Sequence, residues 1–384
     1  MAYDVYYRYG ATSLKLDGIS APNFPNRAGL SLYTNPTVKP KYTHTERYYG
    51  ITDISWNTDY VKSTKRDAIY SFWNTTLSAG YNDFSVIDNR SRMLFDASWN
   101  DWGERWRKSR GGVYDIEYNL QSPVPWTPPL FGCYPLSLNS LANHNLSGDD
   151  LAAVDGAILA NAGDAAILSL SGYALRLTGS AAQDTGASGT VSWRSGNQKN
   201  SLSLFGQIRL PAVNSELYLI SIDDGTNAFR LIAESDDASN NLVSGVITTG
   251  GVTSYITKAD TTKLSIPINT WYDFAVTYDS INGDIYVYYA PANNSSFTQF
   301  LDTQTNIETG IISTQSTPGT YPSDTEWQNV YALRETATGT LTNSANAYMQ
   351  NMFIVDDFIT PQEFNNLRRL CYMWNSKTSG VWPK

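Results

Sequence analysis

Cysteine and histidine are scarce in this 384-residue chain, with two of each. Cys133 and Cys371 lie far apart and form no CxxC spacing, so two buried thiols are expected and a disulfide framework is unsupported. His44 and His144 have neither a G-x-S-x-G nucleophile nor the spacing of metal ligands. The sequence therefore predicts no cofactor, with calcium kept open below.

Long apolar runs are also missing. No stretch approaches the roughly 18 apolar residues of a membrane span. The first ten residues, MAYDVYYRYG, include Asp4 and no apolar core, unlike a secretory signal. We expect no membrane partner and synthesis in a cytoplasm, with any export by another route.

Basic residues are few beyond residue 125. Residues 1–125 hold 15 Lys and Arg against 13 Asp and Glu, whereas the remainder holds 12 against 23. Because phosphate binding depends on Lys and Arg, nucleic acid is excluded as a partner of the acidic part. The change of sign indicates a domain boundary near residue 125, and the chain length favours more than one domain.

Aromatic residues are abundant, with 26 Tyr and 11 Trp. Such amphipathic rings are typical of interfaces and of sugar-stacking surfaces. The clearest local pattern is Thr270–Ala290, in which alternating β-branched and aromatic residues flank Asn282-Gly283. This pattern predicts a β-hairpin, because Asn-Gly readily adopts the positive φ of a tight primed turn.

Residues 1–125 predict a β domain with one helix. Strand-like alternation occurs at 3–9 and 41–60, and again between residues 81 and 123. Thr64 and Asp67 are spaced as a capping box, and apolar residues then recur at helical spacing from Ala68 to Leu77, ending at Gly80.

This order of elements resembles that of siphophage distal tail and minor tail proteins. The resemblance lies in the helix at "AIYSFWN", the strand at "GYNDFSVID" and the segments Trp99–Trp106 and Val113–Leu120. The resemblance implies a tail-tube-like domain in a phage virion. It also implies a homo-oligomeric ring, usually a hexamer, in contact with other tail proteins. Trp99, Trp102 and Trp106 then either anchor the subunit interface or form a buried structural cluster; the sequence leaves both open.

Residues 126–170 predict a linker and a short helix. Five prolines fall within residues 122–135, which favours stiff extended backbone. Ser147 and Asp150 then precede Leu151, Val154, Ile158 and Leu159 at helix-like spacing.

Residues 171–384 predict an antiparallel β-sandwich of the jelly-roll type, because short strands alternate with turn residues. A closing helix is expected after Thr360, with Pro361 at its first position and Glu363 completing a capping box. Its apolar stripe runs from Phe364 through Leu367, Leu370 and Cys371 to Trp374. The hairpin, LYLISIDDGTNAFRLI and MFIVDDFITPQEFNNL together resemble laminin-G and concanavalin-A-like domains.

Three readings of the sandwich follow. Stacking on sugar would use Trp193, Tyr255, Tyr321 and Trp327, which lie among polar residues; the alternative for each is an ordinary packed aromatic residue. Trp271 is expected in the core. The second reading is a glycoside hydrolase, with catalysts among the acidic residues Asp223, Asp224, Asp236, Asp237, Asp284, Asp356 and Asp357.

The string that begins at Glu234 lacks the last glutamate of the E-x-D-x-x-E motif of the related glycanases, so turn residues are the preferred interpretation. Calcium at Asp223–Asp224 or Asp236–Asp237 is a weaker alternative. The third reading is a spacer without a ligand. The leading hypothesis is a non-enzymatic phage tail-tip protein, with a ring-forming N-terminal domain and a sandwich displayed to host glycan or a neighbouring tail protein.

Overall fold

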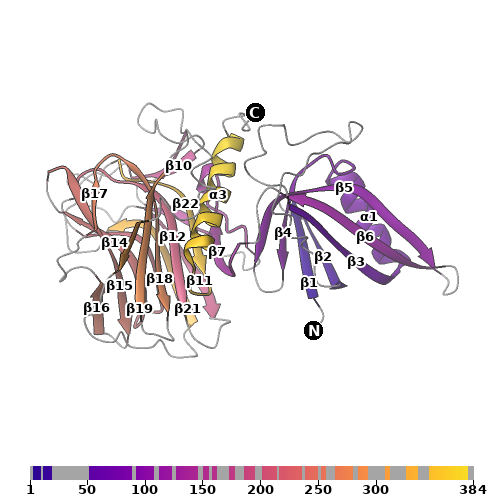
Figure 1. Cartoon of the computed structure of the whole chain (residues 1–384), viewed down its shortest axis with the longest axis horizontal. Coiled ribbons are helices and arrows are strands. Elements are labelled where there is room, and N and C mark those ends of the chain that lie inside the picture. Colours follow the sequence, from indigo (N-terminus) through magenta and orange to yellow (C-terminus); the bar gives the residue numbers. More distant parts are fainter. Residues whose placement is uncertain are drawn as a thin grey trace. The chain divides into compact units, whose positions relative to one another are not determined.

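A computed structural model describes most of the chain, which forms two compact units, residues 1–127 and 128–382 (Figure 1). The described residues are 3–9, 12–19, 52–88, 92–107, 112–122, 127–145, 150–154, 158–161, 173–177, 186–194, 201–213, 216–235, 238–249, 252–256, 264–279, 284–292, 308–311, 326–335 and 346–378. The chain is mainly β with antiparallel sheets and a C-terminal helix, as predicted.

The first unit is a curved sheet with one helical segment. Its strand order is β2-β1-β4-β5-β6-β3, and every pairing is antiparallel. The elements are β1 (Tyr3–Tyr9), β2 (Thr12–Ile19), β3 (Thr52–Lys62), α1 (Ser63–Ser71), η2 (Phe72–Thr76), β4 (Phe84–Asp88), β5 (Met93–Arg107) and β6 (Val113–Ser122). Ile69 and Phe72 of the helical segment join Tyr7, Trp99 and Tyr118 of the strands in one core.

The helix starts differently from the prediction. It begins at Ser63 directly after β3, with Lys62 as N-cap and no side-chain cap, so the Thr64–Asp67 capping box is wrong. Asp67 accepts a hydrogen bond from Arg66 instead (3.0 Å). The segment then widens into the π-helix η2, which ends at Thr76, before the end at Gly80 that the sequence predicts. Gly80 lies in the turn that follows, where φ is +78° and a Cβ would collide with the Trp99 carbonyl oxygen. Only glycine fits that approach.

The described strands at 130–134, 152–154 and 158–161 belong to the sandwich, so the prediction of a linker and a short helix over 126–170 is wrong for these residues. Leu130–Tyr134 forms β7, which pairs with β22 (Tyr348–Val355). Ala152–Val154 and Ile158–Asn161 are strands β8 and β9. β7 and β8 gain ladder hydrogen bonds from the non-adjacent strands β22 and β11, and β9 gains them from β10, the next strand along the chain. This strand pairing overrides the local helical spacing.

The second unit is a sandwich of two antiparallel sheets. Sheet 1 has the order β20-β19-β18-β12-β22-β10-β9, with β7 also on β22, and sheet 2 has the order β16-β15-β14-β13-β21-β11-β8, with β17 also on β15. The remaining strands are β10 (Tyr173–Arg176), β11 (Gly186–Arg194), β12 (Leu202–Arg209), β13 (Leu217–Asp223), β14 (Ala228–Ser235), β15 (Asn240–Thr249), β16 (Val252–Ile256), β17 (Leu264–Pro267), β18 (Trp271–Asp279), β19 (Asp284–Pro291), β20 (Glu308–Ile311) and β21 (Glu326–Glu335).

The predicted hairpin is confirmed in its strands. β18 and β19 pair antiparallel up to Asp279 opposite Asp284, and the Asn282-Gly283 turn lies outside the described residues. Phe274, Val276 and Val287 enter the core between the sheets, as alternation requires. Trp271 is buried, as predicted.

The central strands β12 and β22 of sheet 1 are buried on both faces, because helix α3 (Pro361–Thr378) covers their outer side (Figure 1). Phe364 of α3 packs against Phe205 and Tyr288, with ring centroids 5.6 and 5.8 Å apart. Leu367, Leu370 and Cys371 are buried as the predicted stripe requires, whereas the Trp374 side chain lies outside the description.

The closing helix has the capping box that its sequence predicts. The Glu363 amide donates to Thr360 Oγ1 (3.3 Å), and the Thr360 amide donates to Glu363 Oε2 (2.9 Å). None of the helices in the described part of the chain is long and apolar enough to cross a membrane.

Replacing Thr360 with alanine removes this cap and should lower the local stability of α3 by about 0.5–2 kcal/mol. Hydrogen exchange over residues 361–367 measures the change. Glu363→Gln is the control, because glutamine also serves in a capping box and should leave exchange nearly unchanged. Equal protection in wild type and Thr360→Ala would contradict the prediction.

Candidate functional site

The four aromatic residues predicted to stack on sugar do not form one site. Trp327 is 2% exposed and belongs to the core between the sheets, so it is a packed aromatic residue and not a sugar-stacking one. Trp193 lies opposite Trp327 on β11, and Tyr255 lies opposite Val246 on β16, but the side chains of Trp193 and Tyr255 are outside the description. Tyr321 lies outside the described residues.

The proposed interface tryptophans also separate. Trp99 is 0% exposed within its own unit, so for this residue the structure has the buried cluster and not the interface anchor, the two alternatives that the sequence leaves open. It packs against Tyr118 (5.3 Å between centroids), because alternation on β5 points it inward. Trp102 is half-buried, and the Trp106 side chain lies outside the description.

Asp224 is a turn residue, and Asp223 is the last residue of β13, directly before that turn. Asp224 accepts hydrogen bonds from the Thr226 and Asn227 amides (2.8 and 2.6 Å), and Asp223 accepts one from Asn329 Nδ2 (2.8 Å). Burial alone would raise the pKa of Asp224, but the Asn227 and Thr226 hydrogen bonds bring it below its usual value. A low pKa suits a carboxylate held in a turn, whereas a glycosidase acid needs a raised one.

The other predicted carboxylates form no grouped site among the described residues. Asp357 accepts a hydrogen bond from the adjacent Phe358 amide (2.8 Å), and the Asp356 amide donates to the Pro129 carbonyl (2.8 Å). Asp236, Asp237 and the Asp284 side chain lie outside the description. The described part of the chain holds no group of His, Cys, Asp and Glu suited to a metal ion.

The outer face of sheet 2 carries a different set of polar groups. One row across the strands consists of residues paired directly opposite one another, which therefore share a face: Ser188, Tyr331, Ser221, Arg230, Val246 and Tyr255. Ile220, Ile222 and Leu231, the strand neighbours of Ser221 and Arg230, lie in the core, so Ser221 and Arg230 face outward. The predicted Tyr255 thus occupies one end of this row.

We use the name outer polar face for seven residues of this surface: Tyr218, Ser221, Asp223, Arg230, Asn329, Tyr331 and Arg334. The Arg230 guanidinium lies 4.9 Å from the Tyr218 ring centroid, and its Nη1 donates to Thr248 Oγ1 (3.3 Å). The Arg334 guanidinium lies 4.5 Å from the Tyr331 ring centroid. Cation–π contact and hydrogen bonding hold both guanidinium groups in place.

The centre of this face has unmet hydrogen bonds. Ser221 is 0% exposed and its Oγ has no hydrogen-bond partner, and the Nε of Arg230, which pairs opposite it, has none either. Burial raises the pKa of Tyr331, and so does nearby Asp223, against the opposing effects of Arg334 and Arg230. Hydroxyl, amide, carboxylate and guanidinium groups are therefore concentrated around Tyr331.

This combination can bind carbohydrate, since sugar hydroxyls both donate and accept hydrogen bonds. Sequence reasoning did not find it. The available signal is the alternation of polar residues within strands, as at Ser221 of LYLISID and Arg230 of AFRLIAES, where every second residue enters the core.

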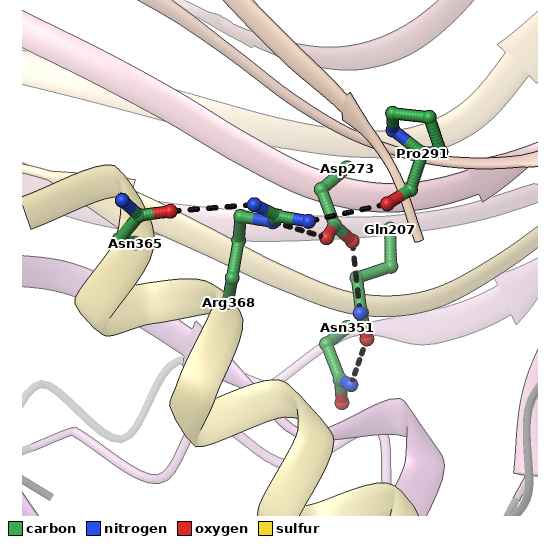
Figure 2. A network of polar contacts seen from close by, with 6 residues as sticks. All are labelled: Gln207, Asp273, Pro291, Asn351, Asn365 and Arg368. Carbon is green, nitrogen blue, oxygen red and sulfur yellow. Dashed lines mark hydrogen bonds and ion pairs between the residues drawn. The ribbon is translucent and has the colours of Figure 1, made fainter. Parts of the chain in front are cut away.

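A second polar cluster, also not predicted, lies beneath α3 (Figure 2). Arg368 Nε donates to Asp273 Oδ2 (2.7 Å), Gln207 Nε2 donates to Asp273 Oδ1 (2.9 Å), and Asn351 Nδ2 donates to Gln207 Oε1 (2.7 Å). Arg368 also donates to Asn365 and to the Pro291 carbonyl. Asp273 and Arg368 are 0% and 2% exposed at their side chains, so this network joins α3 to sheet 1 instead of meeting ligand.

Both cysteines are buried and free, as expected. Burial raises the pKa of the Cys371 thiol well above its ordinary value, with Asp273 adding to the rise. A buried thiol of high pKa is a poor nucleophile, so Cys371 serves packing.

No family model and no curated protein match the chain. Among solved structures, it resembles the binding domain of botulinum neurotoxin DC in complex with rat synaptotagmin II (12% identity, TM-score 0.42, 63% of this chain and 51% of that chain). It also resembles a structure titled for the dependence of botulinum neurotoxin type C cell entry on two ganglioside molecules (12% identity, TM-score 0.43, 63% and 51%). The serotype D binding domain matches at 10% identity and TM-score 0.40, with 62% of this chain and 50% of that chain. The chain thus spans about half the length of these neurotoxin chains, and at this distance the likeness carries no conclusion about ligand or activity.

Proposed function

We propose that the chain is a non-enzymatic adhesion protein of a phage tail tip, whose sandwich binds host-surface glycan through the outer polar face. The observation that carries the glycan part is the set of hydrogen-bonding groups around Tyr331 and Arg230 on a sheet face whose inner side is the core.

The tail part of the proposal is supported by the resemblance of residues 40–122 to tail proteins. In sheet order, β2 and β3 form the two ends of the first unit's sheet. Edge strands can pair with neighbouring subunits, which suits assembly into a ring, with a hexamer as the expected state. Several weak glycan sites on one ring would raise apparent affinity by roughly 10²–10⁴.

Replacing Tyr331 with alanine should weaken glycan binding at least ten-fold, because the hydroxyl and the support for Arg334 are lost together. Binding of the full chain to a glycan array and to purified host polysaccharide measures this. Tyr173→Ala is the matched control, because Tyr173 is also half-buried but lies on β10 of sheet 1.

Three outcomes would contradict the proposal. Silence of wild type on every glycan, together with normal assembly, would favour a spacer. Release of reducing ends from host polysaccharide would favour a glycoside hydrolase. A strictly monomeric protein that enters no virion would end the tail assignment.

A further inference from the structure

We propose that the ligand of the outer polar face is an acidic sugar, whose carboxylate is held by the Arg230 guanidinium. This inference rests on the proposed glycan-binding function and narrows it to one chemical class. It starts from what the two tyrosines of the face already contact.

Each tyrosine ring of the face is already in contact with a cation. Arg230 lies over Tyr218 at 4.9 Å, and Arg334 lies over Tyr331 at 4.5 Å. A ring occupied in this way offers less surface to the apolar side of a neutral sugar. A guanidinium stacked on a ring still presents its N–H edge, and that edge matches the two oxygens of a carboxylate.

Arg230 is the better anchor of the two cations. It lies in the middle of the row, between Ser221 of β13 and Val246 of β15. Among its donors, Nη1 is used by Thr248 and Nε has no partner. Because Nε is buried in the free protein, the guanidinium must turn outward to bind a carboxylate, and a two-pronged contact would then satisfy Nε.

The charges around Arg230 leave a place for an anion. Asp223 is the nearest acid in the row beside it, and its Oδ1 already accepts from Asn329 Nδ2 and the Gly225 amide (2.8 and 3.3 Å). Glu234 lies four residues along β14, toward the other end of that strand. Arg334 adds a second positive charge near Tyr331, so the centre of the face is cationic within an otherwise acidic unit.

The test compares acidic polysaccharides with their own neutralised forms. Full-length protein is titrated against polygalacturonate, alginate, hyaluronan and polysialic acid, each beside its methyl ester, which keeps the ring and hydroxyls but removes the charge. At least one acid should bind ten-fold or more tightly than its ester, and binding should weaken with added salt.

Variants then assign the site. Arg230→Met should reduce binding of the acid at least ten-fold, and Arg230→Lys should recover part of it, because lysine keeps the charge but loses the fork. Arg209→Met is the matched control: Arg209 lies 5.4 Å from the Tyr348 ring centroid on sheet 1, so the same stacked pair is removed elsewhere. It should leave binding unchanged.

The possible outcomes distinguish a failure of the acidic-sugar proposal from a failure of the glycan-binding proposal. If the protein bound neutral glycans, if esterification left binding unchanged and if Tyr331→Ala abolished it, the proposal of an acidic ligand would be overturned. The proposal of glycan binding would stand. Equal loss in Arg230→Met and Arg209→Met would overturn the assignment to Arg230. No binding of any glycan, charged or neutral, would overturn both.

Discussion

Replacing Arg368 with methionine is expected to destabilise the sandwich by about 3–5 kcal/mol, because it leaves the Asp273 carboxylate buried without its cation. The two side chains are joined by a 2.7 Å ion pair between α3 and β18. Hydrogen exchange over residues 264–279 and 361–378 reports the loss where it arises. Exchange rates within the range of wild type in both segments would contradict the prediction.

The loss should depend on pH. Burial raises the pKa of Asp273 above its ordinary value, although Arg368 and Gln207 oppose the rise. In Arg368→Met the main opposing group is absent, so the pKa of the folded state rises further. When folding raises the pKa of a carboxyl group, its contribution to stability is fully present below the pKa of the unfolded state, about 3.9. That contribution is lost as the pH rises through the pKa of the folded state. The variant should therefore be closest to wild type near pH 4–5 and weakest near pH 8.

The double variant Asp273→Leu with Arg368→Met is the control for a charge effect. Removing both charges should recover much of the stability and abolish the added pH dependence, since apolar replacement of a buried pair is often neutral. A double variant as unstable as Arg368→Met alone would show that packing of the arginine, and not the unpaired carboxylate, dominates.

Replacing Trp99 with alanine is expected to cost the first unit about 3–5 kcal/mol through the cavity it leaves. Trp99 is fully buried, packs against Tyr7 and Tyr118, and donates from Nε1 to the Asp101 carbonyl (2.9 Å). Hydrogen exchange over β1 and β6 should rise sharply, whereas residues 264–279 of the sandwich should keep their protection.

Trp102 provides the comparison. It is half-buried beside Tyr70 and Trp73, with Arg66 6.0 Å from its ring centroid, so Trp102→Ala should cost the fold less. Sedimentation of both variants separates packing from assembly. If Trp99→Ala kept its stability and changed only the oligomeric state, the assignment of Trp99 to the core would be wrong.

Local patterns were enough where neighbouring residues decide the conformation. The β18–β19 strands, the Thr360–Glu363 cap and the buried stripe of α3 follow from alternation, capping chemistry and helical spacing, and the structure has each of them. The capping box predicted at Thr64 and Asp67 was wrong, because α1 begins at Ser63 directly after β3 and Thr64 is already inside the helix.

Alternation and charge balance in the sequence by themselves determined a mainly β chain with a boundary near residue 125 and a C-terminal helix. Only the tertiary structure decided which polar residues meet. Ser221 and Arg230 become neighbours through strand register, and Asp273 reaches Arg368 only when α3 closes over sheet 1. Strand pairing and helix docking bring together residues that are distant in sequence, and the spacing of residues along the chain does not predict those contacts.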